Sequence, residues 1–177
     1  MRKILFFSLF IFLTIGIVEA QTIQTNSSGF DKSKLEFGGN LSFSFGKSQF
    51  SGNYKSLNIN PQIGYLIHPK FSIGFGPSYI YRGYSKSDYS ENYGGLTFYG
   101  RFRPINYLLV LAQPEFYRTW GKNFDNRFVP SLLLGAGGII PVGTGGVSVT
   151  MSYDVIQNNY SPYGDQIVYS VGYVFRF

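Results

Sequence analysis

The sequence predicts an all-β protein, an eight-stranded antiparallel up-and-down β-barrel that crosses a membrane and follows an N-terminal signal peptide. Three observations support this fold class. Large apolar residues alternate with small or polar ones over eight segments, which is the period of a β-strand. The chain is 19% aromatic and only 14% charged, whereas an average globular chain has about 25% charged residues. The connections between the segments alternate between long and short.

The first 20 residues are typical of a secretory signal peptide. Arg2 and Lys3 precede an apolar run over residues 4–18, and Ala20 completes a pattern of small residues suited to cleavage. A transmembrane helix is the alternative, but this run is shorter than the about 20 residues that a helix needs to span a bilayer. We expect residues 21–33 to form a short periplasmic tail and residues 34–177 to form the barrel domain.

Four alternating segments fill the first half of the barrel domain, at residues 35–46, 57–67, 71–82 and 96–103. The first sets Phe37 and Phe43 on one face and Glu36 and Ser42 on the other, and the next three repeat this pattern. A tight turn around Pro69 separates the second segment from the third.

Four more segments follow, at residues 108–117, 128–140, 147–155 and 167–177. The sixth is the least regular, because both of its faces are apolar or small. The last keeps its large residues at odd positions up to the C-terminal Phe177. Four of these residues resemble the assembly signal of outer-membrane β-barrels of Gram-negative bacteria, namely Tyr169, Tyr173, Phe175 and Phe177. The resemblance implies recognition by the barrel assembly machinery.

The longer, polar connections are expected at residues 47–56, 83–95, 119–127 and 157–165, and the others are tight. Outer-membrane barrels have an even number of strands, short periplasmic turns and longer outer loops. The order of long and short connections therefore places both ends of the barrel in the periplasm.

The alternative fold is a soluble eight-stranded barrel of the lipocalin type. An eight-stranded barrel has an interior that side chains just fill. The face rich in Phe, Tyr, Leu and Ile is too bulky for that space, whereas the face rich in Gly, Ser and Asn fits it. We therefore expect the apolar face to contact lipid. Taken together, the segments resemble the small OmpX/OmpA-type, porin-like outer-membrane β-barrel family, which implies a location in the outer membrane.

The amino-acid composition limits the kinds of site and partner that the chain can have. The chain has no cysteine, so disulfides and thiolate metal sites are excluded. Without residues 1–20 it keeps 13 basic and 8 acidic residues, a net charge of +5. For an exported chain this charge favours outer-membrane lipids and lipopolysaccharide as partners over nucleic acid.

Seven charged residues are expected to point into the lumen as a charge network, because buried charges are normally paired. Glu115, Asp154 and Arg82 should lie at one level. Glu36 and Arg176 should meet where the first strand closes on the last, with Arg101 and Arg103 facing them.

Two further groups of residues are interpreted from their positions in the predicted strands. The aromatic residues near the outer strand ends are expected at the membrane interface or on an adhesion surface, namely Tyr54, Tyr84, Tyr89, Tyr93, Trp120, Tyr160 and Tyr163. Four prolines lie within strands on the outward face and are expected at β-bulges or at the rim, namely Pro61, Pro77, Pro114 and Pro130.

No catalytic constellation, metal site or cofactor is predicted. The only histidine, His68, lies in a predicted turn, far from the outer leaflet where a membrane-barrel hydrolase would need it. The glycines from Gly135 to Gly146 lack the helix and the Lys-Ser/Thr pair of a phosphate-binding loop.

Three functions stay open. The first is a non-enzymatic barrel with a packed polar lumen, which contributes membrane integrity or a surface interaction platform for an unidentified partner. The second is a narrow pore or small-solute carrier. The third, a lipid-modifying enzyme, is disfavoured by the single histidine.

Overall fold

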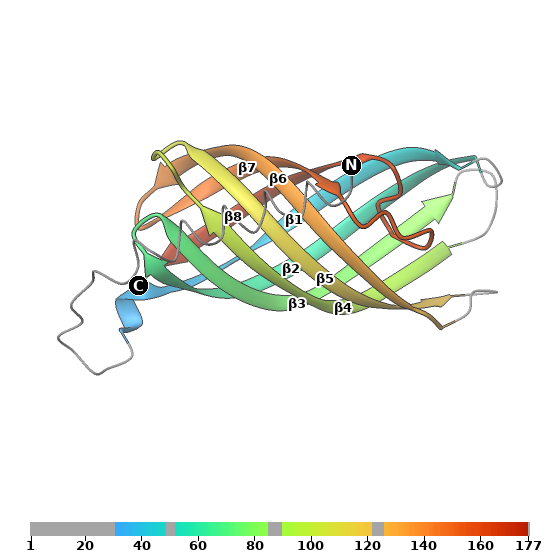
Figure 1. The fold of residues 1–177 in the computed structure, drawn as a ribbon, viewed down its shortest axis with the longest axis horizontal. Coiled ribbons are helices and arrows are strands. Elements are labelled where there is room, and N and C mark those ends of the chain that lie inside the picture. Colours follow the sequence, from blue (N-terminus) through green and yellow to red (C-terminus); the bar gives the residue numbers. More distant parts are fainter. Residues whose placement is uncertain (1–30, 49–51, 85–89, 122–125, 177) are drawn as a thin grey trace, which may run out of the picture. The chain divides into compact units, whose positions relative to one another are not determined.

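The computed structural model describes residues 31–48, 52–84, 90–121 and 126–176. From Lys32 onward the chain forms one closed antiparallel barrel, in which each strand pairs with its neighbours in the sequence and β1 pairs with β8 (Figure 1). This confirms the predicted fold class. The predicted signal peptide and most of the predicted tail lie outside the described residues.

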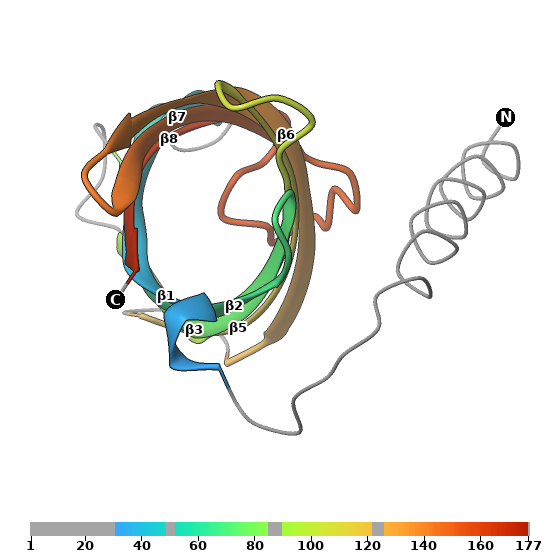
Figure 2. The same cartoon turned by 90° about the vertical axis from the view of Figure 1, so that its left-hand side faces the viewer.

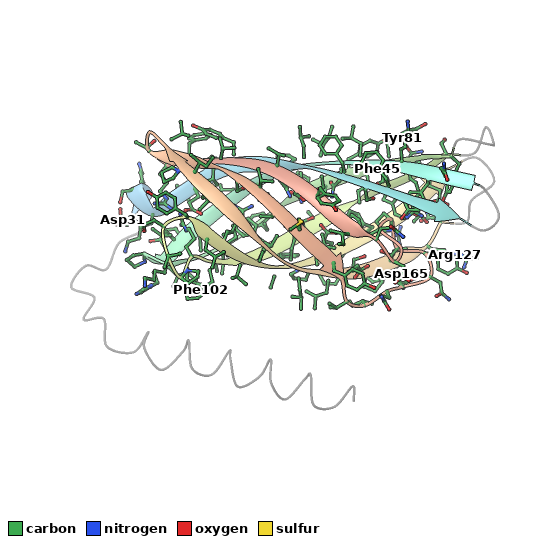
Figure 3. The ribbon with its side chains drawn as sticks, turned by 90° about the horizontal axis from the view of Figure 1, so that it is seen from above. Asp31, Phe45, Tyr81, Phe102, Arg127 and Asp165 are labelled. Carbon is green, nitrogen blue, oxygen red and sulfur yellow. The ribbon has the colours of Figure 1, made fainter. Side chains whose placement is uncertain are left out.

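The barrel begins with a short 3-10 helix, η1 (Lys32–Lys34). The strands are β1 (Leu35–Ser48), β2 (Gly52–His68), β3 (Phe71–Tyr84), β4 (Ser90–Phe102), β5 (Leu108–Gly121), β6 (Phe128–Val142), β7 (Gly145–Asp154) and β8 (Ile167–Arg176). We call the end with the tight β2–β3, β4–β5 and β6–β7 connections the turn end, and the opposite end the loop end. In Figure 3, Phe102 lies at the turn end, and Arg127 and Asp165 lie at the loop end.

Strands β1 to β5 run further toward the loop end than the sequence predicted. β2 begins five residues before the predicted position 57 and β4 six residues before position 96. The ladder continues through these polar residues, for example in the pairs Tyr54↔Tyr84 and Gly83↔Ser90. Much of the predicted connections 47–56 and 83–95 is therefore strand, because backbone pairing continues beyond the apolar pattern.

The two faces of the wall differ as predicted. Outward residues such as Phe75, Val149 and Met151 are 52–56% exposed, although they are large and apolar. Many inward residues are small or polar and buried, among them Ser42, Asn58, Gln62, Thr97, Gln113 and Ser131. A smaller group of buried inward residues is apolar, including Ile80, Leu133 and Val168. An exposed apolar surface that encircles a closed sheet is the arrangement expected in lipid. None of the described helices is long and apolar enough to span a bilayer.

The prolines lie on the outward face, but the prediction of β-bulges at them is wrong. The register of β2 on β3 shifts only between Leu66 and His68. At Pro61 the ladder is instead interrupted between the pairs Ile59↔Tyr79 and Ile63↔Phe75, and it resumes in the same register. Pro61 thus lies opposite Pro77, and neither residue has an N–H to donate.

The interior of the barrel as candidate functional site

A segment of the β7–β8 connection closes the loop end of the lumen. Figure 2, a view along the barrel, shows part of this connection within the ring of strands. Tyr163, in its centre, is only 1% exposed. Its hydroxyl donates to Glu115 Oε2 at 2.7 Å and accepts from Asn58 Nδ2 at 2.9 Å, and its backbone oxygen accepts from the Tyr54 hydroxyl at 2.8 Å. We call residues 161–164 the plug.

Two strand residues hold the plug next to Tyr163. Arg82 Nη2 donates to the backbone oxygens of Ser161, at 3.1 Å, and of Pro162. Asp154 Oδ2 accepts from the Ser161 hydroxyl at 2.6 Å. The plug therefore supplies acceptors to a buried guanidinium and a donor to a buried carboxylate, as buried charges require.

The predicted network of Arg82, Glu115 and Asp154 is thus partly wrong. All three side chains are buried in the lumen, but Arg82 forms its ion pair with Glu91, at 3.5 Å. Glu91 was missed because residues 83–95 were assigned to a loop. The alternation of inward residues Tyr99 and Thr97 continues to position 91, and this signal could have revealed it.

Glu115, like Asp154, has no exposed surface. Besides Tyr163, Gln113 Nε2 donates to its Oε1 at 2.7 Å and Thr97 Oγ1 lies at 3.5 Å. Burial raises the pKa of the Tyr163 phenol well above its usual range, and the charge of Glu115 adds to this effect. Tyr163 therefore remains a hydrogen-bond donor to Glu115.

Tyrosines extend this polar layer across the lumen. The hydroxyl of Tyr117 lies 2.9 Å from Ser78 Oγ and 3.3 Å from the hydroxyl of Tyr163. Ser78 in turn donates to Asn58 Oδ1 at 2.8 Å. Apolar side chains pack around the same rings, namely Ile80, Tyr93, Val129, Leu133 and Val168.

Four of the tyrosines expected at the membrane interface point inward instead. Tyr54, Tyr93 and Tyr163 are 6%, 1% and 1% exposed. Tyr54 and Tyr93 have the inward parity of their strands, which extend beyond the predicted boundaries. Tyr84 bonds to Glu91 at 3.0 Å. Of the others, Trp120 and Tyr160 are exposed, and Tyr89 lies outside the described residues.

At the turn end a second charged cluster lies at the seam between β1 and β8. Glu36 pairs across the ladder with Arg176. The Glu36 side chain is 1% exposed, and its Oε1 accepts from Arg176 Nη2 at 2.6 Å and from Arg103 Nη2 at 3.1 Å. We call Glu36, Arg103 and Arg176 the seam cluster.

Arg101 shares this end of the lumen but not the seam cluster. It helps to line a void of about 10 Å³ together with Glu36 and Arg103. Its guanidinium donates to Gln62 and lies 4.0 Å from the centre of the Tyr99 ring. The expected group of one acid with three arginines is therefore an acid with two, and the third arginine is satisfied by an amide and an aromatic ring.

The outward side of the seam carries the predicted assembly signal. Tyr169 and Tyr173 are 48% and 46% exposed on the outer wall. Phe175 stacks on Phe37 with ring centres 6.0 Å apart. Phe177 lies outside the described residues.

The described part of the chain contains no group of three or more His, Cys, Asp or Glu side chains that could hold a metal. His68 is exposed at the end of β2, and its Nδ1 accepts from the backbone N–H of Lys70 in the following turn at 3.2 Å.

Solved structures share this architecture. Neisserial surface protein A superimposes with a TM-score of 0.62 at 14% identity, covering 82% of this chain and 98% of that one. The chain therefore has the fold of the small outer-membrane β-barrels. The Yersinia pestis outer membrane protein Ail, in a phospholipid bilayer nanodisc, superimposes with a TM-score of 0.52 at 15% identity, covering 82% of this chain and 99% of that one. No protein-family model and no curated protein matches the sequence.

Proposed function

We propose that this protein is a non-enzymatic integral outer-membrane barrel with a closed lumen, which contributes membrane integrity and presents a surface at its loop end. The observation that carries the proposal is the plug. Tyr163, Ser161 and Pro162 fill the loop end of the lumen and bond to β2, β3, β5 and β7. A lumen closed in this way has no open path for solutes.

The proposal includes location and partners. We infer that residues 1–20 direct export, that the turn end faces the periplasm and that the outer wall contacts lipid. The fold shared with outer-membrane proteins supports this placement. We further propose that the assembly machinery recognises β8, and that basic residues beyond the lipid contact lipopolysaccharide phosphates.

Planar bilayer recording separates the closed barrel from the narrow pore. The wild-type protein should give no steady unit conductance. Tyr163→Ala removes the centre of the plug and should produce conductance, whereas Tyr160→Ala, in the same connection but exposed, should not. Steady conductance of the wild type would replace this proposal with the pore.

Cell assays test the proposed contribution to membrane integrity. Cells without the protein should take up more of a hydrophobic dye, and the wild-type gene should restore the barrier. If lipid A masses change with the protein while the barrier does not, the enzyme hypothesis replaces the structural one.

A further inference from the structure

A groove of about 510 Å³ crosses the outer wall over β8, β1, β2 and β3. Its floor consists of the outward positions Gly39, Pro61 and Pro77. Gly39 pairs with Tyr173 on one side and with Pro61 on the other, and Pro61 lies opposite Pro77. Small side chains at three matched positions leave a depression between rows of larger side chains.

Large side chains border the groove on both sides. Toward the turn end the ladder aligns Phe175, Phe37, Ile63 and Phe75. Toward the loop end it aligns Val171, Leu41, Ile59 and Tyr79. Neighbouring strands lie about 4.8 Å apart, so the groove over four strands is roughly 14 Å long. At a strand tilt of about 35–45°, the groove crosses roughly 8–10 Å of membrane depth, which fits within one leaflet of the about 30 Å hydrocarbon core.

The backbone keeps the groove open. The two facing prolines have rigid rings that cannot swing into it. Behind them, the carbonyl oxygen of Pro61 approaches Gly76 so closely that a Cβ there would lie 1.9 Å from it. The floor is therefore formed before any ligand binds, which lowers the entropic cost of binding.

The groove slopes toward the turn end. Residues that lie opposite one another on successive strands form a row around the barrel, and from β1 to β7 such a row moves toward the loop end. The row that starts at Glu36, near the turn end of β1, reaches Asp154, at the loop end of β7. The groove follows such a row, so its β8 end, at Tyr173, is the one closer to the turn end. The turn-end rim carries the exposed Lys32, Lys34 and Lys70. This basic rim suits the phosphate of a lipid whose chain lies in the groove.

A second copy of the chain fits the groove poorly. In a bilayer, the two-fold axis of a dimer lies along the membrane normal. Because strands of such barrels tilt by about 35–45°, a groove that runs across them is steeply inclined, and the facing grooves and ridges of two copies would cross. A ridge of one copy could not lie along the groove of the other, whereas a flexible acyl chain can follow it.

From this geometry we propose that the groove is a binding site for one acyl chain of a phospholipid in the leaflet at the turn end. The site goes beyond general lipid contact, because the chain is held in a preformed groove. It rests on the membrane placement proposed above.

Photocrosslinking tests this site. The full-length mature barrel is inserted into vesicles of phosphatidylethanolamine and phosphatidylglycerol that carry a diazirine on one acyl chain, and adducts are mapped by mass spectrometry. Labelling of groove residues Phe37, Ile63 and Phe75 should exceed labelling of Val110 and Phe116, on the outward face of β5, several-fold. Equal labelling of the two walls would overturn the site, and so would weaker labelling of the groove than of β5, which a second copy of the chain covering the groove would produce.

A filled groove provides the second measurement. Pro61→Leu with Pro77→Leu places larger side chains on the floor and should reduce groove labelling to the level of β5. Pro130→Leu, an outward proline on β6 outside the groove, should leave it unchanged. Undiminished labelling in the filled variant would contradict the proposal, and the wild-type map remains decisive if that variant does not fold. Heat-dependent gel migration shows separately whether the barrel has inserted. Failed insertion would count against the membrane placement, whereas an inserted barrel without groove labelling would count against the site.

Discussion

At Glu36 a buried carboxylate from the first strand meets an arginine from the last. Its side chain is 1% exposed, whereas those of Arg103 and Arg176 are 17% and 28% exposed. The acid therefore bears most of the desolvation cost and relies on both arginines. Removing one partner of such a buried pair costs more free energy of unfolding than the intact pair contributes, because the other charge is left buried without its partner.

We predict that Glu36→Gln lowers the free energy of unfolding by about 3 kcal/mol, the lower end for breaking a buried ion pair, because Arg176 is partly exposed. Adding Arg176→Gln should recover part of the loss. Urea unfolding of the four proteins of a double-mutant cycle measures this coupling, with Asp165→Asn, a loop-end carboxylate, as a control for charge. Additive effects would mean that the pair does not stabilise the seam.

At the level of the strands, glycines permit close approach where a side chain would collide with backbone. A Cβ at Gly76 would lie 1.9 Å from the Pro61 oxygen, whereas a Cβ at Gly138 would meet only the Tyr107 oxygen, at 3.8 Å. We predict that Gly76→Ala costs about 1–3 kcal/mol, as overpacking does, and that Gly138→Ala costs far less. Urea midpoints of the two variants compare them, and equal midpoints would show that β2 and β3 can separate freely.

The last strand carries the proposed assembly signal. Deleting Phe177, or changing it to Ser, should lower the amount of protein in the outer membrane while export continues, because we propose that the machinery reads the terminal aromatic residue. Membrane fractionation and immunoblotting measure both quantities, and Tyr160→Ser serves as the aromatic control. Unchanged outer-membrane levels for the Phe177 variants would remove this role.

The sequence predicted the number and order of the strands and which side chains point inward or outward. These features depend on a period of two, which the lipid outside and the lumen inside impose on every strand. The same parity, carried past position 96 to Glu91 and past position 57 to Tyr54, would also have placed these residues in the lumen. The plug was not predictable in this way. Tyr163 lies in an irregular connection, and its partners Glu115, Asn58 and Tyr54 come from distant strands. No local pattern encodes such contacts.

On the scale of the whole molecule, the wall separates an apolar exterior from a mainly polar interior. Outer aromatic rings contact one another between strands, as Phe75 and Phe98 do with ring centres 6.2 Å apart. Inside, hydroxyl, amide and charged groups form layers from the seam cluster to the plug. A substitution that changes the polarity of a side chain should therefore have opposite effects on stability on the two faces of one strand.

Strand β3 allows this to be tested with a matched pair. Phe75, near mid-strand, is 52% exposed on the outer wall, and Phe75→Arg should impair folding by about 2–4 kcal/mol, the range for a cation at the bilayer midplane. Ser78, although inward, is unsuitable as the control because its hydroxyl bonds to Asn58 and Tyr117. Ser72 is 1% exposed, and its hydroxyl has no hydrogen-bond partner among the described residues.

Ser72→Ala should therefore be nearly silent, since it removes no hydrogen bond to another side chain. Folding into vesicles, followed by urea titration, gives both values. In a soluble barrel the outer wall would face water, where Phe75→Arg should be tolerated. A harmless Phe75→Arg would thus contradict the lipid-facing wall, and the ranking of the two variants reports which medium surrounds it.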